Sequence, residues 1–408
     1  MLTSVLNNRS LTFYQPTAIA ASSDVSSSYA GGIASVALAN TSLITATTTN
    51  GFNAQFSTYL TALNTERDRL AQKVAEGLSN SPSYVGARSD GVGLAWDYEA
   101  ADIKMGGKGS ADWSPAQQEE ILQNRPDVVN KPKTVDGKQI NPKGGVRGAE
   151  GHHQKNVADH PEHQADPDNI KFYKDKQSHL EEGHNGNFQN ETDGPMTDKN
   201  KMLENTNSKR VFKNELRGLG VAVAIGLGVG FTIGFAVTLA QSGITPESIK
   251  LATIEGAKGG FEAGAMSAVG YGIGRTIGEV VNASVTGLLE NIGINITENI
   301  AKMVNMGVVG TLTIVVFSAY QFIKLKQNGL AIRDALLQVG KQALFSLSLL
   351  AVSIAAQGVW GGPAGIIVSV SVGIILISYT VGQSVHQRHF AERVRVYMID
   401  KCRPTFAV

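Results

Sequence analysis

The chain contains a single cysteine, Cys402, among its 408 residues. An internal disulfide framework is therefore excluded, and so is a zinc site built from cysteine thiolates. A bound metal would have to be held by histidine, aspartate, glutamate or asparagine side chains. The sequence also lacks a basic start followed by a compact apolar core, so it shows no N-terminal signal peptide.

Charged residues are scarce in two parts of the chain and concentrated in a third. Residues 1–50 contain only two, Arg9 and Asp24, among many Ser, Thr, Ala and Asn side chains. Residues 218–385 are apolar and rich in glycine, whereas residues 97–217 are dense in charge and contain six of the eight histidines. The net charge of +1 therefore conceals a soluble part that is joined to a membrane part.

The composition of residues 1–50 predicts a disordered Ser/Thr-rich leader. One interpretation is a plain flexible tail, and the other is an export signal that a secretion machine recognises. Either interpretation gives this segment no folded core of its own.

Residues 51–78 carry apolar side chains at helical spacing, with charged residues between them, which predicts an amphipathic helix that packs on another helix or on a partner chain. The Gly- and Ser-rich stretch that follows reads as a linker, so we treat residues 51–110 as helix plus linker. Ser114 is a good N-cap and Pro115 suits the first helical position, which predicts a short helix starting there.

The C-terminal half, residues 206–408, is predicted to be an all-α transmembrane domain. An apolar helix of about 20 residues spans about 30 Å of hydrocarbon. No charged residue lies between residues 342 and 385, and a turn signal at 360–363 divides this run into two spans. The four predicted spans are residues 218–240, 303–323, 342–359 and 364–383.

Basic residues flank these spans in three places. They precede the first span, lie between the second and third, and follow the fourth, whereas the segment between the first two spans carries more acids than bases. The positive-inside rule then predicts that the histidine-rich segment, the second loop and the C-terminus share the cytoplasmic side. The basic residues are Lys209, Arg210, Lys213 and Arg217, then Lys324, Lys326, Arg333 and Lys341, then Arg388, Arg393, Arg395, Lys401 and Arg403.

Glycine recurs at every fourth position in two stretches of this half. Small residues at that interval form a flat helix face that another backbone can approach closely. The face would serve either a glycine-zipper assembly of several copies or ordinary packing within one helix bundle. Residues 251–299 carry too many charges for a simple span and are predicted to be interfacial or re-entrant. The glycines are Gly226, Gly230 and Gly234, then Gly270, Gly274 and Gly278.

Four of the six histidines of the polar part lie in an ordered set of motifs. Glu-Gly-His-His occupies residues 150–153, Asp-Pro-Asp-Asn-Ile occupies residues 166–170, and His179 and His184 follow. The local patterns predict a first strand at 148–157, a second strand at 169–173 and a helix at 174–182. This order is that of a ββα unit.

The residue types suit phosphodiester hydrolysis, which needs a base to activate water and a divalent cation to absorb charge on the phosphate. Adjacent histidines on a strand point to opposite sides, so one can bind a metal while its neighbour activates water. Histidines on the following helix can complete the metal site, because neutral imidazole binds transition metals well.

This segment resembles the HNH/endonuclease VII superfamily, also called His-Me finger nucleases, and within it the GHH-type nuclease domains of bacterial toxins. The resemblance covers about a ninth of the chain. It implies His153 as general base, Asn169 as the residue that orients the base, and a divalent ion such as Mg²⁺, Mn²⁺, Ni²⁺ or Zn²⁺ as cofactor. The metal ligands that it implies are His152, His179 and His184.

His179 and His184 depart from the simplest spacing, because a separation of four residues would stack both on one face of an α-helix. We expect Gly183 to end the helix so that His184 can turn back, with Asn185 or a water molecule as the alternative ligand. Glu150 is either a further catalytic residue or an ion-pair partner of Arg147.

Two further histidines and three lysines of this segment are not among the predicted metal ligands. His160 and His163 are expected to be bystanders in the loop. The lysines at 171, 174 and 176 are either phosphate contacts or ordinary solvated charges.

The fold class predicted for residues 111–205 is an α+β ββα-metal nuclease core with mostly α-helical flanks. The predicted function is a membrane-associated, metal-dependent endonuclease acting on DNA, or on RNA, as a bacterial toxin or anti-phage effector. Its expected partners are nucleic acid, the lipid bilayer, an immunity protein and further copies of the chain that assemble through the glycine-rich helices. The alternative is a pore-forming or translocation protein with a non-catalytic HNH-like segment.

Overall fold

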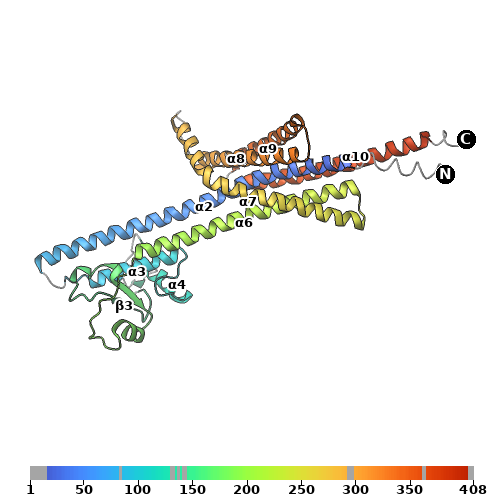
Figure 1. Cartoon of the computed structure of the whole chain (residues 1–408). Helices are drawn as coiled ribbons and strands as arrows, with labels where there is room; N and C mark the ends of the chain where they lie inside the picture. The colour runs from blue at the N-terminus through green and yellow to red at the C-terminus, as the bar shows by residue number, and fades with distance from the viewer. Residues whose placement is uncertain are drawn as a thin grey trace. The chain divides into compact units, whose positions relative to one another are not determined.

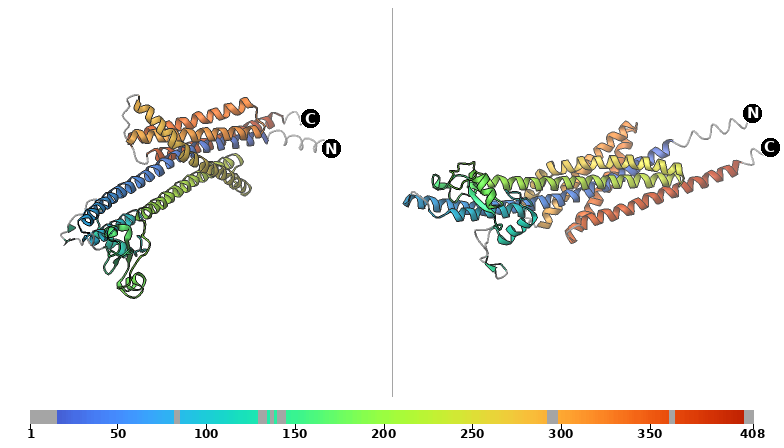
Figure 2. Two further views of the ribbon diagram at one scale, coloured as in Figure 1. Left: turned by 60° about the vertical axis from the view of Figure 1, so that its left-hand side comes forward. Right: turned by 90° about the horizontal axis from the view of Figure 1, so that it is seen from below.

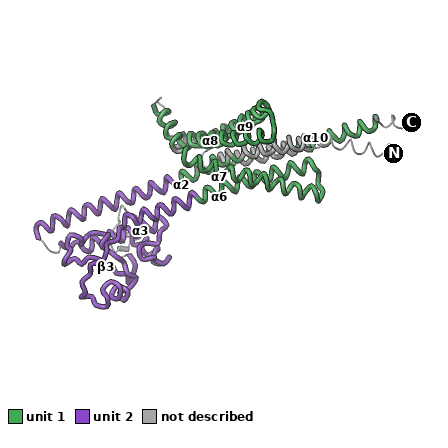
Figure 3. Tube along the Cα trace, in the orientation of Figure 1, with its two compact units in different colours: residues 1–47, 216–408 green, residues 48–215 purple. Residues whose placement is uncertain are grey.

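The computed structural model describes residues 16–81, 85–128, 134–135, 138–139, 145–291, 298–360 and 364–402. These residues are mostly helical and divide into two compact units (Figure 3). Unit 1 consists of Met1–Thr47 and Leu216–Val408, and unit 2 consists of Thr48–Glu215. In the chain, unit 2 is therefore an insertion within unit 1.

Helix α2, Pro16–Asn80, corrects the expectation of a disordered leader, because residues 16–50 form its first part. Small side chains explain this. Ala39 is fully buried in the core of unit 1, and the hydroxyls of Thr41 and Thr45 donate to the carbonyls four residues earlier, at 3.0 and 2.9 Å. The Ser, Thr and Ala side chains thus permit close helix packing with no unpaired polar group at these two threonines. Residues 1–15 lie outside the described residues.

Among the described residues of unit 1, three helices are by length and composition apolar enough to cross a membrane. They contain the spans predicted at 218–240, 303–323 and 342–359. The fourth predicted span, 364–383, falls in helix α10, where most side chains lie outside the described part of the chain. The helices of unit 1, besides the first part of α2, are α6 (Lys199–Ser242, from Leu216 on), α7 (Pro246–Asn291), α8 (Glu298–Gln327), α9 (Ile332–Trp360) and α10 (Ala364–Cys402) (Figures 1 and 2).

The glycine faces are covered within the chain. A Cβ added at Gly226 would lie 2.6 Å from the carbonyl oxygen of Ala263, and one at Gly234 would lie 2.8 Å from the carbonyl oxygen of Glu255. On the second face, a Cβ at Gly274 would lie 2.8 Å from the side chain of Val309 in α8. These glycines therefore allow the helices of one bundle to approach closely, which is the second of the two interpretations drawn from the sequence.

Helix α7 is a single unbroken helix across most of the segment expected to be interfacial or re-entrant. It runs antiparallel to α6, as the glycine contacts show, and also antiparallel to α8. Glu262 of α7 pairs with Lys324 near the end of α8 at 2.6 Å, while a Cβ at Gly270 would lie 3.0 Å from Thr313, nearer the middle of α8. Helices α6 and α8 therefore run in the same direction, whereas the flanking charges predict opposite directions for them.

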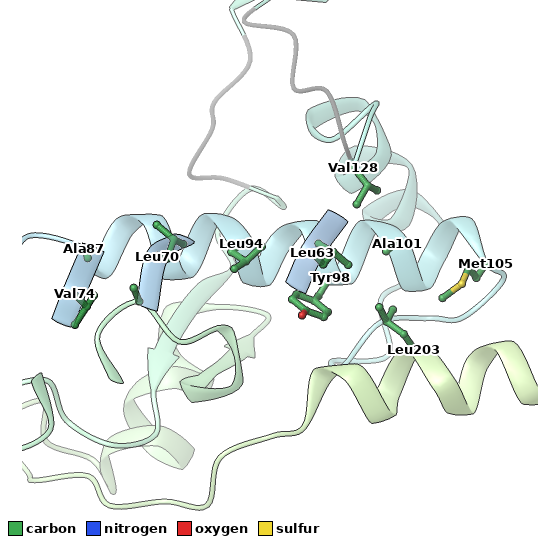
Figure 4. Packing of buried hydrophobic residues seen from close by; sticks show 11 residues of the cluster. Leu63, Leu70, Val74, Ala87, Leu94, Tyr98, Ala101, Met105, Val128 and Leu203 are labelled. Carbon is green, nitrogen blue, oxygen red and sulfur yellow. The ribbon is translucent and has the colours of Figure 1, made fainter. Parts of the chain in front are cut away.

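Helix α3, Arg88–Lys104, forms the centre of unit 2, where the sequence predicted a linker. Glycine marks a close approach here, because a Cβ at Gly91 would lie 2.8 Å from the backbone of Ala165. Leu94 and Tyr98 of α3 pack on the apolar face of α2, which includes Leu63 and Leu70 (Figure 4). The prediction that residues 51–78 pack on another helix is thereby confirmed.

A short helix and two small hairpins complete unit 2. The predicted start of helix α4 is confirmed, with Ser114 as N-cap in a capping box with Gln117, and with Pro115 at the first position. A second core contains Trp96 of α3, stacked on Phe172 at a ring distance of 3.8 Å. The remaining elements are α4 (Pro115–Asn124), β1 (Thr134–Val135), β2 (Lys138–Gln139), β3 (Glu150–His153), η1 (Pro161–His163), η2 (Pro167–Asn169), β4 (Ile170–Tyr173), α5 (Lys176–Ser178) and η3 (His179–Gly183).

Candidate metal centre

Strands β3 and β4 pair antiparallel and set the frame of the histidine-rich segment. Glu150 lies opposite Tyr173 in this register, and His153 lies opposite Ile170. The two predicted strands are therefore present, although the first is shorter than residues 148–157 because the chain leaves the ladder after His153. The pairing fixes both adjacent histidines at the end of a strand.

Asn169 ties together the loop between the two strands. Its Oδ1 accepts the backbone N–H of Lys155 at 2.7 Å, and its Nδ2 donates to the carbonyls of Lys155 and His163 at 3.0 and 3.2 Å. The side chain is fully buried. The resemblance implied that Asn169 orients the base, but its amide contacts the loop backbone and not the ring of His153. Any effect on the base passes through the loop.

The two aspartates before Asn169 anchor this hairpin to the helices of unit 2. Arg67 of α2 contacts Asp168 at 2.8 Å and Asp166 at 3.1 Å. The other carboxylate oxygen of Asp168 accepts the backbone N–H of Lys199 at the start of α6, at 2.9 Å. The sequence did not predict these two ion pairs of Arg67, because a charged residue on the polar face of an amphipathic helix is usually exposed to solvent.

Three histidines meet above the hairpin. The nitrogens that His152, His179 and His184 can offer to a metal all lie within 4.8 Å of one another. His152 Nδ1 is 3.1 Å from His179 Nε2. Two ligand nitrogens at about 2.0–2.1 Å from one ion lie roughly 3 Å apart, so this separation suits a shared metal. His184 Nδ1 is buried and has no hydrogen-bond partner among the described residues, as expected of a nitrogen kept for a ligand.

A π-helical turn, His179–Gly183, explains how two histidines five residues apart reach one site. In a π-helix residues i and i+5 lie one turn apart, as i and i+4 nearly do in an α-helix. Gly183 is the last residue of this turn and His184 is its C-cap, in agreement with the expectation that the helix ends at Gly183. A Cβ at Gly183 would lie 3.0 Å from the ring of His179 and 3.2 Å from that of Tyr173, so a larger residue there would displace these rings by a few tenths of an ångström.

Glu150 orients one of the histidines. Its Oε2 lies 2.5 Å from His179 Nδ1. A carboxylate can only accept here, so Nδ1 carries the proton and the Nε2 lone pair faces His152. The described contacts of Glu150 thus include His179 and not the suggested partner Arg147. A carboxylate behind a metal-binding histidine raises the basicity of the ligand and fixes its ring.

His152 is ready to bind a metal at neutral pH. Burial, followed by the neighbouring His184 and His179, lowers its pKa to about 4. It is therefore neutral near pH 7 and needs to lose no proton before it coordinates a cation.

His153 lies on the other side of the strand from this cluster. Its Nε2 is 3.2 Å from the carbonyl oxygen of Gln164, and its Nδ1 is buried with no hydrogen-bond partner among the described residues. A carbonyl only accepts, so Nε2 carries the proton and Nδ1 keeps a lone pair. Burial lowers the pKa of His153 to about 4, although the Gln164 contact opposes the shift. Gln164 was missed from sequence, because no residue pattern marks it.

The other histidines of the loop stay outside the cluster. His160 lies 3.4 Å from Glu162, and His163 lies 3.8 Å from Asp166. Neither contributes to the three-histidine group, in agreement with their prediction as bystanders.

No protein-family model, no curated protein and no solved structure matches this chain. The interpretation of the centre therefore rests on its own geometry and on the sequence motifs.

Proposed function

We propose that unit 2 is a metal-dependent endonuclease of the HNH, or His-Me finger, type, and that unit 1 associates it with a lipid bilayer. The observation that carries this proposal is the meeting of His152, His179 and His184, with Glu150 behind His179. Three neutral nitrogen ligands leave coordination positions open, which is typical of catalytic rather than structural metal sites. The order of two strands followed by a short helical turn supports the proposal of a ββα-metal core.

The residues take distinct parts in this scheme. His152, His179 and His184 hold the divalent cation, which would supply positive charge to the phosphate and to the leaving oxygen. His153 takes a proton from the attacking water at Nδ1, since its Nε2–H is directed to the carbonyl of Gln164. Nδ1 is buried, so part of the chain around it has to shift before water reaches it. Glu150 positions His179 and does not act on water.

The substrate in this proposal is DNA, with RNA as the alternative. No base-reading element was found in the sequence, so cleavage with little sequence preference is expected. An enzyme of this kind at a membrane suits a bacterial toxin or an anti-phage effector, and a toxin would need an immunity protein in its own cell. The three apolar helices of unit 1 are compatible with a bilayer as the site of action.

The first test is a nicking assay. The full-length chain in detergent micelles is incubated with supercoiled plasmid and with Mg²⁺, Mn²⁺, Ni²⁺ or Zn²⁺. We expect metal-dependent nicking that falls by about 10²–10⁴-fold in His153→Ala, since a general base contributes about that much. His179→Ala should fall as far, and His160→Ala, outside the cluster, serves as the matched control. A folded wild-type protein that leaves both DNA and RNA intact with every cation would overturn the proposal.

A further inference from the structure

A cavity of about 400 Å³ lies beside the metal centre in unit 2. Its walls include Ser110, Lys171, Lys174, Ser178, Glu182 and Lys199, and we call it the lysine pocket. Tyr173 also lines it and stacks on the ring of His179 at 5.5 Å. The pocket and the histidine cluster therefore share a wall.

Lys199 is the unusual residue of this pocket. Its side chain is fully buried, and its Nζ has no hydrogen-bond partner among the described residues. An ammonium group has three donors, so leaving all of them unfilled away from water is costly. A ligand with several acceptor oxygens would satisfy them.

The nearest acid does not fill these donors. Glu99 lies 3.6 Å from Lys199 Nζ and balances its charge. Its carboxylate already accepts the backbone N–H and the hydroxyl of Ser110, and the indole N–H of Trp113 at 2.9 Å. Phe172 lies on another side, with its ring centre 5.5 Å from the ammonium group. Lys199 therefore lines the pocket with an ammonium group that has no hydrogen-bond acceptor among the described residues.

The rest of the wall favours an anion with oxygen acceptors. Lys171 and Lys174 add two further ammonium groups to the wall. Of the two acids in the wall, Asp175 is engaged as the N-cap of α5, where it accepts the Ser178 N–H at 2.7 Å. Lysine ammonium groups are typical phosphate contacts.

We propose that the lysine pocket binds a backbone phosphate of the nucleic-acid substrate, next to the phosphodiester cleaved at the histidine cluster. This inference rests on the proposed function, because it assigns a subsite to the same enzyme. It makes the substrate a polyanion with at least two phosphates and not an isolated phosphodiester. The pocket therefore acts on substrate affinity, whereas the histidine cluster acts on the chemical step.

The test compares two substrates in the full-length protein. A single-stranded oligonucleotide can occupy both sites, whereas bis(p-nitrophenyl) phosphate can occupy only the metal centre. In Lys171→Ala/Lys174→Ala and in Lys199→Met we expect the oligonucleotide KM to rise at least about tenfold. The kcat and the rate on the small diester should stay within about twofold. The salt dependence of the oligonucleotide affinity should weaken, by about 0.7 in log–log slope per lost phosphate contact.

Lys176→Ala, which removes a lysine that does not line the pocket, is the matched control. An unchanged KM in folded pocket variants would overturn the inference. If Lys199→Met fails to fold, the double variant of the two outer lysines decides alone. Calorimetric titration with inorganic phosphate gives a readout besides activity, and binding should be lost in that double variant. If the wild type cleaves neither substrate, the proposed function fails, while this titration still decides whether the pocket holds an anion.

Discussion

At the scale of single residues, the candidate centre is organised by groups that would not touch substrate. Glu150 fixes the ring of His179, and a backbone carbonyl, that of Gln164, fixes the tautomer of His153. Asn169 holds the loop that carries Gln164. The grouping of His152, His179 and His184 was predictable from the sequence, because two adjacent histidines on a strand followed by two more are a rare pattern. It could not assign Glu150 or Asn169 their contacts, because these depend on how a loop of irregular backbone folds.

The role of Glu150 leads to a prediction about metal affinity. Glu150→Gln keeps the shape of the side chain but removes the negative charge behind His179. Losing such a partner weakens metal binding by about 10–100-fold, which corresponds to about 1.4–2.7 kcal/mol. Titration of the metal-free protein with Zn²⁺ should show this weakening, and excess metal should restore most of the nicking activity. Glu162→Gln, on an exposed acid near the bystander histidines, should bind metal as the wild type does. If nicking by Glu150→Gln stays low at saturating metal, the carboxylate acts in the chemical step instead.

At the scale of secondary-structure elements, regular patterns were predictable and exceptions were not. The apolar runs of α6, α8 and α9, the two strands of the hairpin and the cap at Ser114 all follow from local sequence. Helix α3 was missed because its glycines read as linker residues, although Gly91 serves a close backbone approach. The first part of α2 was missed because its small polar side chains resemble those of disordered segments. In both places tertiary packing decides the structure.

The π-turn is the element on which the spacing of the histidines depends. Gly183→Ala would place a Cβ against the rings of His179 and Tyr173, so the turn has to narrow or the histidine has to move. We expect metal affinity to fall at least about tenfold, since a displaced ligand is largely lost, while the melting temperature of the metal-free protein changes by only a few degrees. Gly51→Ala, where an added Cβ meets no atom within 4 Å, is the matched control. Wild-type metal affinity in Gly183→Ala would show that the cluster does not require this turn.

At the scale of the whole molecule, the order of the helices and the charges that flank them predict different crossing directions. The charges predict that α6 and α8 cross in opposite directions, whereas in unit 1 the intervening α7 runs antiparallel to both. The charges of α7 were the reason for excluding it as a crossing helix. Three of them are paired in the structure: Glu262 pairs with Lys324 of α8, and Glu255 pairs with Lys258 within α7. Pairing lowers the free-energy cost of a charge in an apolar environment. Composition alone therefore underestimates how readily such a helix could enter a membrane.

Cysteine labelling distinguishes the two arrangements. Because the chain has a single native cysteine, one substitution removes all background labelling. In a Cys402→Ser chain, single cysteines replace Leu216 and Ser242, at the two ends of the unit 1 part of α6, and Asn328, after α8. With membrane vesicles and an impermeant maleimide, the helix directions predict that Ser242→Cys and Asn328→Cys are labelled from one side and Leu216→Cys from the other. Labelling of Leu216→Cys and Asn328→Cys from the same side would favour the charge rule and exclude a crossing α7.

If unit 2 is the nuclease proposed above, its placement within unit 1 bears on how it is retained. Its chain enters through α2 and leaves through α6, and both helices continue into unit 1. A protease that cuts either connection leaves the other intact, so release of unit 2 takes two separate cleavages. A domain fused to one end of an anchor is freed by a single cut. The inserted arrangement therefore holds unit 2 by two connections, and partial proteolysis would leave the proposed activity attached to unit 1.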